Sequence, residues 1–223
     1  MTHSTPAAVL WDMDGTLIDS EPYWLSAEND LVAAFGGEWT HDDAMAVLGS
    51  GLFVSARALQ AKGVELDENA IVDALTDRVM TQLRDSGIPW RPGARELLGE
   101  LREAGIPTAL VTMSIGRMAH HIVNNLGFTG FDAVISGDDV QNPKPHPEPY
   151  HAGAAALGVE IADCVAIEDS PPGATSAFAS GATVVGVPFM IDIPAEQAHA
   201  IWPTLDGCTL EHLSELHARV RAR

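Results

Sequence analysis

Short apolar runs alternate with segments of helical periodicity along most of the chain. The apolar runs end at polar residues and predict buried strands at 7–14, 107–114, 131–136, 163–169 and 182–187. The segments between them predict helices at 94–105, 117–127, 147–158 and 171–181. Short buried strands that alternate with helices are typical of an α/β fold, in which helices cover both faces of a parallel sheet.

One long interval departs from this alternation. It contains no apolar run suited to a buried strand, and its periodicity predicts four helices at 22–37, 42–49, 51–63 and 68–87. We therefore predict a helical domain at 17–87, inserted into an α/β core domain made of residues 1–16 and 88–223. A chain of 223 residues is long enough for one such core and a smaller insertion.

Composition and charge restrict the possible partners. Hydrophobic residues make up 46% of the chain and charged residues 19%, which favours a substantial core over disorder. The net charge is -19, and both the inserted segment and the remainder are acidic. Nucleic acids and anionic membrane surfaces would be repelled, so neither is expected as a partner. A small phosphorylated metabolite stays possible, because its site needs only local positive charge.

Cysteine content and the N-terminal sequence favour a cytoplasmic protein. Cys164 and Cys208 are too few for a disulfide framework, and no basic segment followed by an apolar stretch opens the chain. The longest uncharged stretch, residues 170–191, is interrupted by several prolines and glycines. A helix followed by a strand therefore explains this stretch better than a membrane span does. We expect a monomer.

The first polar segment that follows a predicted strand is Asp12-Met13-Asp14-Gly15-Thr16. Strand residues alternate between faces, so Asp12 and Asp14 can point the same way. Two ionised carboxylates at close range repel each other unless a cation lies between them or one pKa rises. Gly15 permits a tight turn whose N–H groups can bind an anion. The alternative is that these aspartates only end a strand.

Three further segments follow predicted strands and lie at the sheet edge where α/β folds bind ligands. Thr112 ends one apolar run, and its hydroxyl can donate to a phosphate oxygen. Lys144 lies between two prolines, which restrict the backbone and favour a role in holding phosphate charge. Glu168 and Asp169 are suited to a hard cation such as Mg²⁺, although Asp169 or the next residue, Ser170, could instead cap the following helix.

In order and spacing, these segments resemble the four motifs of the haloacid dehalogenase-like superfamily. The stretches DMDGTLIDSEP (12–22), KPHPEPY (144–150) and AIEDSPPGATSA (166–177) are especially similar to the branch that contains β-phosphoglucomutases and small sugar-phosphate phosphatases. The resemblance covers nearly the whole chain. It implies a Rossmann-like core and identifies the inserted helices as a cap domain over the site.

The resemblance also implies the chemistry. Asp12 is then the nucleophile that becomes an aspartyl-phosphate, and Asp14 is the general acid and later the general base. Mg²⁺ is held by Asp12, by the backbone carbonyl of Asp14 and by Asp169, with Glu168 close or also coordinating.

The resemblance further implies which residues hold the transferring phosphoryl group. Thr112 and Lys144 match the positions that do so. We expect the substrate-binding residues to be Gly15, Thr112, Met113 and Lys144.

The cap departs from the mutase pattern. β-Phosphoglucomutases carry a Lys and an Arg around a Gly in the first cap loop, whereas the stretch Val47-Leu48-Gly49-Ser50-Gly51-Leu52 has no positive charge. A mutase must also bind a second phosphate in the cap, so a Mg²⁺-dependent phosphatase is the leading hypothesis. Arg57, about two helical turns beyond Gly49, is the cap cation that stays open as a source of this charge. A sugar phosphomutase and a non-catalytic binding protein are the alternatives.

Aromatic residues of the inserted segment are expected to serve structure. Trp24, at the position of a characteristic mutase histidine, is predicted to lie in the cap core with Trp39 and Phe53.

Overall fold

A six-stranded parallel sheet forms the centre of the larger part of the molecule. The computed structural model describes residues 5–47 and 50–222. Neighbouring strands follow the order β3-β2-β1-β4-β5-β6, and every pairing is parallel. The strands are β1 (Ala8–Trp11), β2 (Thr108–Val111), β3 (Ala133–Ile135), β4 (Cys164–Glu168), β5 (Thr183–Gly186) and β6 (Ala200–Ile201).

Strand alternation gives the sheet two buried faces. Ala8 and Leu10 of β1 pack with the helices α7 (Glu148–Leu157) and α8 (Pro171–Ser180). Val9 and Trp11, which point the opposite way, join the core shared with α5 (Ala94–Glu103), α6 (Gly116–Asn124) and α9 (Leu210–Arg221). The predicted α/β fold with helices on both faces is therefore confirmed.

The register of the central strands determines where the polar segments meet. Trp11, the last residue of β1, pairs with Leu110 of β2 on one side and with Ile167 of β4 on the other. The residues that follow these three positions consequently emerge side by side at one edge of the sheet. This edge is the carboxyl edge, where ligands bind in open α/β sheets.

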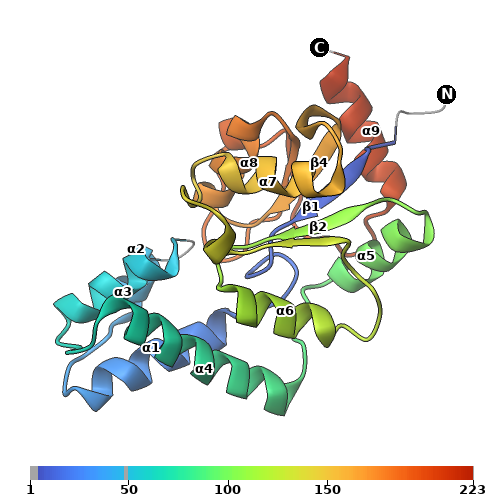
Figure 1. Cartoon of the computed structure of the whole chain (residues 1–223). Helices are drawn as coiled ribbons and strands as arrows, with labels where there is room; N and C mark the ends of the chain where they lie inside the picture. Colours follow the sequence, from blue (N-terminus) through green and yellow to red (C-terminus); the bar gives the residue numbers. More distant parts are fainter. Residues whose placement is uncertain (1–4, 48–49, 223) are drawn as a thin grey trace.

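Four helices lie beside the α/β part, next to this edge (Figure 1). They are α1 (Glu21–Ala34), α2 (His41–Val47), α3 (Leu52–Ala61) and α4 (Glu68–Ser86). Helix α4 packs along α1 and α3, and Val32, Leu59 and Leu75 are buried between them. No strand occurs in the part of 17–87 that the structure describes, as the sequence predicts.

The five predicted strands and eight predicted helices are all present, with ends that shift by a few residues. Strand β6 and helix α9 were not predicted. Phe53 is a further correction, because its side chain is 45% exposed at the start of α3 and does not belong to the core. Within the described residues no helix is both long and apolar enough to cross a membrane.

Candidate active site

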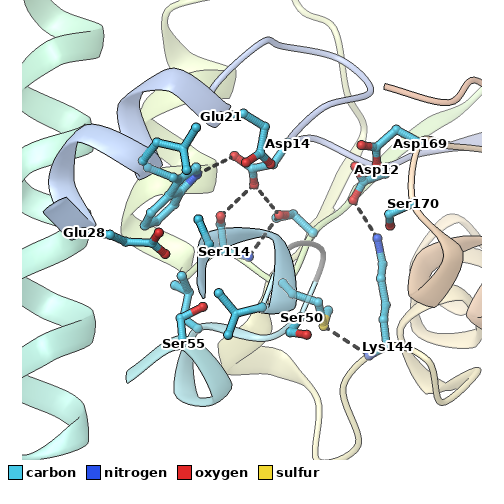
Figure 2. Close-up of a pocket in the computed structure, with 17 residues that line it drawn as sticks. Asp12, Asp14, Glu21, Glu28, Ser50, Ser55, Ser114, Lys144, Asp169 and Ser170 are labelled. Atoms are coloured by element: carbon cyan, nitrogen blue, oxygen red, sulfur yellow. Dashed lines mark hydrogen bonds and ion pairs between the residues drawn. The ribbon is translucent and has the colours of Figure 1, made fainter. Parts of the chain in front are cut away.

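The four polar segments meet in one pocket between the carboxyl edge of the sheet and the four-helix part (Figure 2). Strand β1 leads into Asp12 and Asp14, β2 leads into Thr112, and β4 leads into Asp169. Lys144 reaches the same pocket from the loop before α7. The convergence that the sequence predicts is therefore present in the structure.

Lys144 connects three of the buried groups. Its Nζ donates to Asp12 Oδ1 at 2.6 Å, to Glu168 Oε1 at 2.7 Å and to the carbonyl oxygen of Val111 at 2.9 Å. Burial alone would lower the pKa of Lys144, but the charges of Asp12 and Glu168 outweigh it and raise that pKa. Lys144 is therefore a permanent, fixed cation beside the Asp12 carboxylate.

Asp12 has one oxygen committed and one free. Oδ1 accepts from Lys144, whereas Oδ2 is buried and has no hydrogen-bond partner among the described residues. Burial raises the pKa of Asp12 to about 7, although Lys144 opposes this rise. A buried oxygen without a partner is costly unless a ligand completes its contacts.

Asp12, Glu168 and Asp169 form a buried acidic group suited to a divalent cation. One carboxylate oxygen from each lies within 4.8 Å of the others. Burial, followed by the charge of Asp12, raises the pKa of Asp169 well above its usual value. Three oxygen donors, one of them without a partner, are the ligand type that Mg²⁺ prefers. The residues present therefore fit a magnesium ion.

Glu168 has more partners than the other two acids of this group. It is fully buried, and Oε1 accepts from the Tyr150 hydroxyl at 2.6 Å as well as from Lys144. Oε2 accepts from the backbone N–H of Asp169 at 3.2 Å. These contacts tie Glu168 to the orientation of Lys144. The sequence left open whether Asp169 or Ser170 caps the following helix. The Ser170 side chain accepts from the backbone N–H of Gly173, so Ser170 is the residue that caps α8.

Gly15 is required by a close approach. Its φ is +83°, a conformation that favours glycine, and a Cβ at this position would lie 2.1 Å from Asp169 Oδ2. Any side chain here would displace the Asp169 carboxylate. The sequence correctly singles out Gly15 for its turn, but it could not show this contact.

The Asp14 carboxylate points away from the acidic group and toward α1. Its Oδ1 accepts from Ser20 Oγ at 2.5 Å and from Trp24 Nε1 at 3.1 Å. Its Oδ2 accepts from Ser114 Oγ at 2.7 Å and from Thr112 Oγ1 at 3.3 Å. Four donors hold this side chain in a single orientation, and it is not part of the metal-suited group.

Thr112 and Met113, two of the predicted substrate-binding residues, line the pocket. Thr112 Oγ1 also accepts from the backbone N–H of Ser114 at 3.0 Å. Met113 Sδ lies 3.3 Å from the backbone nitrogen of Lys144, so it supports the loop that carries the lysine. Ser114 was missed, although it follows Thr112 in the same loop.

One face of α1 was also missed. Glu21, Trp24, Leu25 and Glu28 line the pocket at positions i, i+3, i+4 and i+7, the spacing of one helical face. Trp24 is buried as predicted, but the hydrogen bond from its indole to Asp14 makes it part of the site.

Two of these α1 residues are acids whose pKa values are strongly raised. Burial raises the pKa of Glu21 to about 8, with a further contribution from the Asp14 charge. Burial also raises the pKa of Glu28 to about 7, while a hydrogen bond from Trp39 opposes the shift. Acids with raised pKa values in a pocket are typical of functional sites.

Cations are scarce on the helical side of the pocket. Lys144 is the only Lys or Arg that lines it within the described residues. Arg57 instead pairs with Glu68 at 2.9 Å, and Lys62 pairs with Asp43 at 2.6 Å. Of the cap loop, Leu48 and Gly49 lie outside the described residues, and Ser50 and Leu52 line the pocket without contributing charge.

Sequence comparison links the chain to known phosphatases. Hexitol phosphatase A of Escherichia coli is 33% identical over 189 residues, which cover 83% of this chain and 84% of that protein. Fructose-1-phosphate phosphatase YqaB of Escherichia coli is 30% identical over 185 residues, which cover 81% of this chain and 96% of that protein.

Solved structures share the fold over almost the full chain. The β-phosphoglucomutase of Clostridium difficile superimposes with a TM-score of 0.84 at 21% identity and covers 98% of this chain and 100% of its own. CbbY of Rhodobacter sphaeroides in complex with phosphate has a TM-score of 0.84 at 26% identity, covering 93% of this chain and 99% of its own.

The family profile of haloacid dehalogenase-like hydrolases matches residues 6–181. That span contains all four polar segments and the helices between them. The resemblance noted in the sequence is confirmed, as is the expectation of an enzyme over a binding protein. The chain belongs to the haloacid dehalogenase-like hydrolases.

Proposed function

We propose that this protein is a Mg²⁺-dependent phosphatase that hydrolyses a small sugar or polyol phosphate through an aspartyl-phosphate at Asp12. The observation that carries the proposal is the pocket in which Asp12, Asp14, Lys144 and Asp169 meet. In this proposal residues 17–87 form the cap, and residues 1–16 and 88–223 form the core. The working form is a cytoplasmic monomer.

Asp12 acts first. A carboxylate oxygen of Asp12 attacks phosphorus, so an O–P bond forms to Asp12 while the bond from phosphorus to the leaving oxygen breaks. Lys144, whose Nζ lies 2.6 Å from Asp12 Oδ1, would orient the attacking carboxylate and offset the negative charge of the transferring phosphoryl group. In this proposal Thr112, which lines the pocket, holds a phosphoryl oxygen.

Asp14 moves the proton in both halves of the reaction. It gives a proton to the leaving oxygen, which departs as an alcohol. It then takes a proton from water as that water attacks phosphorus, so inorganic phosphate leaves and Asp12 is regenerated. The hydroxyls of Ser20 and Ser114 and the indole of Trp24 keep the carboxyl group aimed at the pocket.

Asp12, Asp169 and Glu168 would hold the magnesium ion, with the backbone carbonyl of Asp14 as a further ligand. When bound, the ion offsets the repulsion between the Asp12 carboxylate and the anionic substrate. This assignment is supported by the close approach of three carboxylate oxygens, one from each acid, which lie within 4.8 Å of one another.

Hydrolysis is favoured over phosphomutase chemistry by the charge of the cap. A mutase holds a bisphosphate, and removing the second phosphate from water is costly without cationic partners. The described helical residues around the pocket offer carboxylates and hydroxyls, while Arg57 and Lys62 pair with acids elsewhere. The similarity to a hexitol phosphatase and a fructose-1-phosphate phosphatase supports a sugar or polyol monophosphate as substrate.

The test is to supply β-glucose 1-phosphate with a catalytic trace of the 1,6-bisphosphate and Mg²⁺, beside a set of other small monophosphates. Release of inorganic phosphate from one of these substrates, without accumulation of glucose 6-phosphate, is expected. Near-stoichiometric conversion to glucose 6-phosphate would contradict the phosphatase proposal and support a sugar phosphomutase instead.

A further inference from the structure

Glu28 is a buried acid that faces the pocket from the cap. Its side chain belongs to α1, is 7% exposed and lines the same pocket as Asp12 and Lys144. Figure 2 places Glu28 on the α1 side of the pocket and Lys144 on the opposite side. A phosphoryl group held at Lys144 and Asp12 would therefore direct the rest of its molecule toward Glu28.

One carboxylate oxygen of Glu28 accepts a hydrogen bond within the protein, and the other can accept one from a ligand. Oε2 accepts from Trp39 Nε1 at 3.0 Å, and Trp39 is the only hydrogen-bond partner of the Glu28 side chain among the described residues. Trp39 is itself buried at 6% exposure, so the bond fixes the position of the carboxylate. A carboxylate oriented in this way can accept from a ligand through Oε1.

The fold does not need an acid at this position. A buried carboxylate with one neutral donor is unfavourable compared with an apolar or amide side chain. The raised pKa of Glu28, caused by burial, reflects this cost. Such a group is typical of a residue retained for binding.

The surroundings of Glu28 suit a neutral, hydroxylated molecule. Ser50 and Ser55 contribute hydroxyls to the same side of the pocket, and Leu25, Ala44 and Val47 contribute apolar contacts. Carboxylates and hydroxyls match the hydroxyls and carbon atoms of a sugar or polyol. A second phosphate would instead meet Glu28 and Glu21, and no Lys or Arg among the described residues lines that side of the pocket.

We propose that Glu28, oriented by Trp39, determines specificity by accepting a hydrogen bond from a hydroxyl of the substrate distal to its phosphate. The inference rests on the proposed phosphatase function and deepens it: the substrate is a polyhydroxylated monophosphate with an uncharged distal end. Glu28 acts on the choice of substrate and takes no part in bond breaking.

The experiment compares polyol monophosphates with a phosphate that lacks hydroxyls. The kcat/KM values for sorbitol 6-phosphate, mannitol 1-phosphate and glycerol 3-phosphate are each divided by the value for n-hexyl phosphate. The wild type, Glu28→Gln and Trp39→Phe are measured, with Glu38→Gln as the matched control. Glu38 is an exposed acid next to Trp39 that does not line the pocket.

In Glu28→Gln, assayed at pH 8, above the raised pKa of Glu28, the ratio for the best polyol phosphate should fall by about tenfold, because a charge-assisted hydrogen bond is replaced by a weaker neutral one. Trp39→Phe should lower the ratio in the same direction, and Glu38→Gln should not change it. Circular dichroism melting identifies any variant that fails to fold. If one of Glu28→Gln and Trp39→Phe does not fold, the ratio measured for the other one tests the inference.

Two results would overturn the inference in distinguishable ways. If wild type hydrolyses both kinds of phosphate and Glu28→Gln keeps the ratio within twofold, Glu28 does not determine specificity, and the phosphatase function stands. If wild type releases phosphate from none of these substrates, the proposed function fails and the inference fails with it.

Discussion

Lys144 is the residue on which the charge balance of the site depends. All three of its bonds go to buried oxygens, and two of those belong to acids. The chain has only one other lysine, Lys62, which forms an exposed pair with Asp43. The two lysines therefore provide a matched comparison between a buried and an exposed ion pair.

Replacing Lys144 by Met should destabilise the metal-free protein by about 3–5 kcal/mol, since Asp12 and Glu168 are left buried without a cation. Lys62→Met should cost no more than about 1 kcal/mol, as expected for an exposed pair. Urea unfolding at pH 8 with a chelator measures both values. Equal, small losses would show that Lys144 does not balance the buried acids.

Asp14→Asn should reduce turnover by roughly 10²–10⁴-fold, the range typical of lost acid–base catalysis. The loss should be larger for alkyl phosphates than for aryl phosphates, because a poor leaving group needs the proton more. Steady-state rates on one substrate of each kind check this. Equal losses on both would exclude Asp14 as the acid for the leaving group.

At the scale of elements, helix α1 shows what sequence patterns can and cannot predict. The helix was predicted from its periodicity, and the strand-end motifs predicted Asp12, Asp14, Lys144 and Asp169 because neighbouring parallel strands end together. Glu28 was missed, because its role depends on how α1 sits against the sheet edge. Its helical spacing from Glu21 and Trp24 was the available signal.

Two elements of the core were missed for reasons of length and context. Strand β6 is only two residues long, too short to show a period. Helix α9 lies beyond the last motif, and its buried residues Leu213 and Leu216 mark an amphipathic pattern that was not considered. Neither element contributes to the pocket.

Glu28→Gln should raise the stability of the folded protein by an amount that depends on pH. The folded-state pKa of Glu28, about 7, lies above its ordinary value of 4.5. Between these values the unfolded chain loses the proton while the folded chain keeps it, so wild-type stability falls as pH rises. The advantage of the variant should therefore be near zero below pH 4.5, grow up to about pH 7 and then level off.

Thermal melts of wild type, Glu28→Gln and the exposed control Glu38→Gln across this pH range test the expectation. A difference in melting temperature between Glu28→Gln and wild type that is the same at every pH would contradict the raised pKa of Glu28.

At the scale of the whole molecule, Arg117 joins the two parts. It lies on α6 of the sheet-containing part and pairs with Asp73 and Asp77 on α4 of the four-helix part. Its Nη2 also donates to the carbonyl oxygen of Asp73 at 3.0 Å. The contact is partly exposed, so it should be sensitive to salt.

Arg117→Ala should lower the free energy of unfolding by about 0.2–1 kcal/mol at low salt, as for other exposed ion pairs. Most of this difference should vanish at 1 M NaCl, because the charges are then screened. Urea unfolding at two salt concentrations gives the values. A loss that is independent of salt would mean that packing, and not charge, joins the parts at this point.

The central claim is that Asp12, with magnesium, hydrolyses a phosphate monoester. The most direct measurement is the release of inorganic phosphate by the wild type and by Asp12→Asn, each with excess Mg²⁺ and with excess chelator. We expect release only from the wild type with Mg²⁺. Undiminished release in chelator would contradict the metal requirement, and full release by Asp12→Asn would contradict the nucleophile.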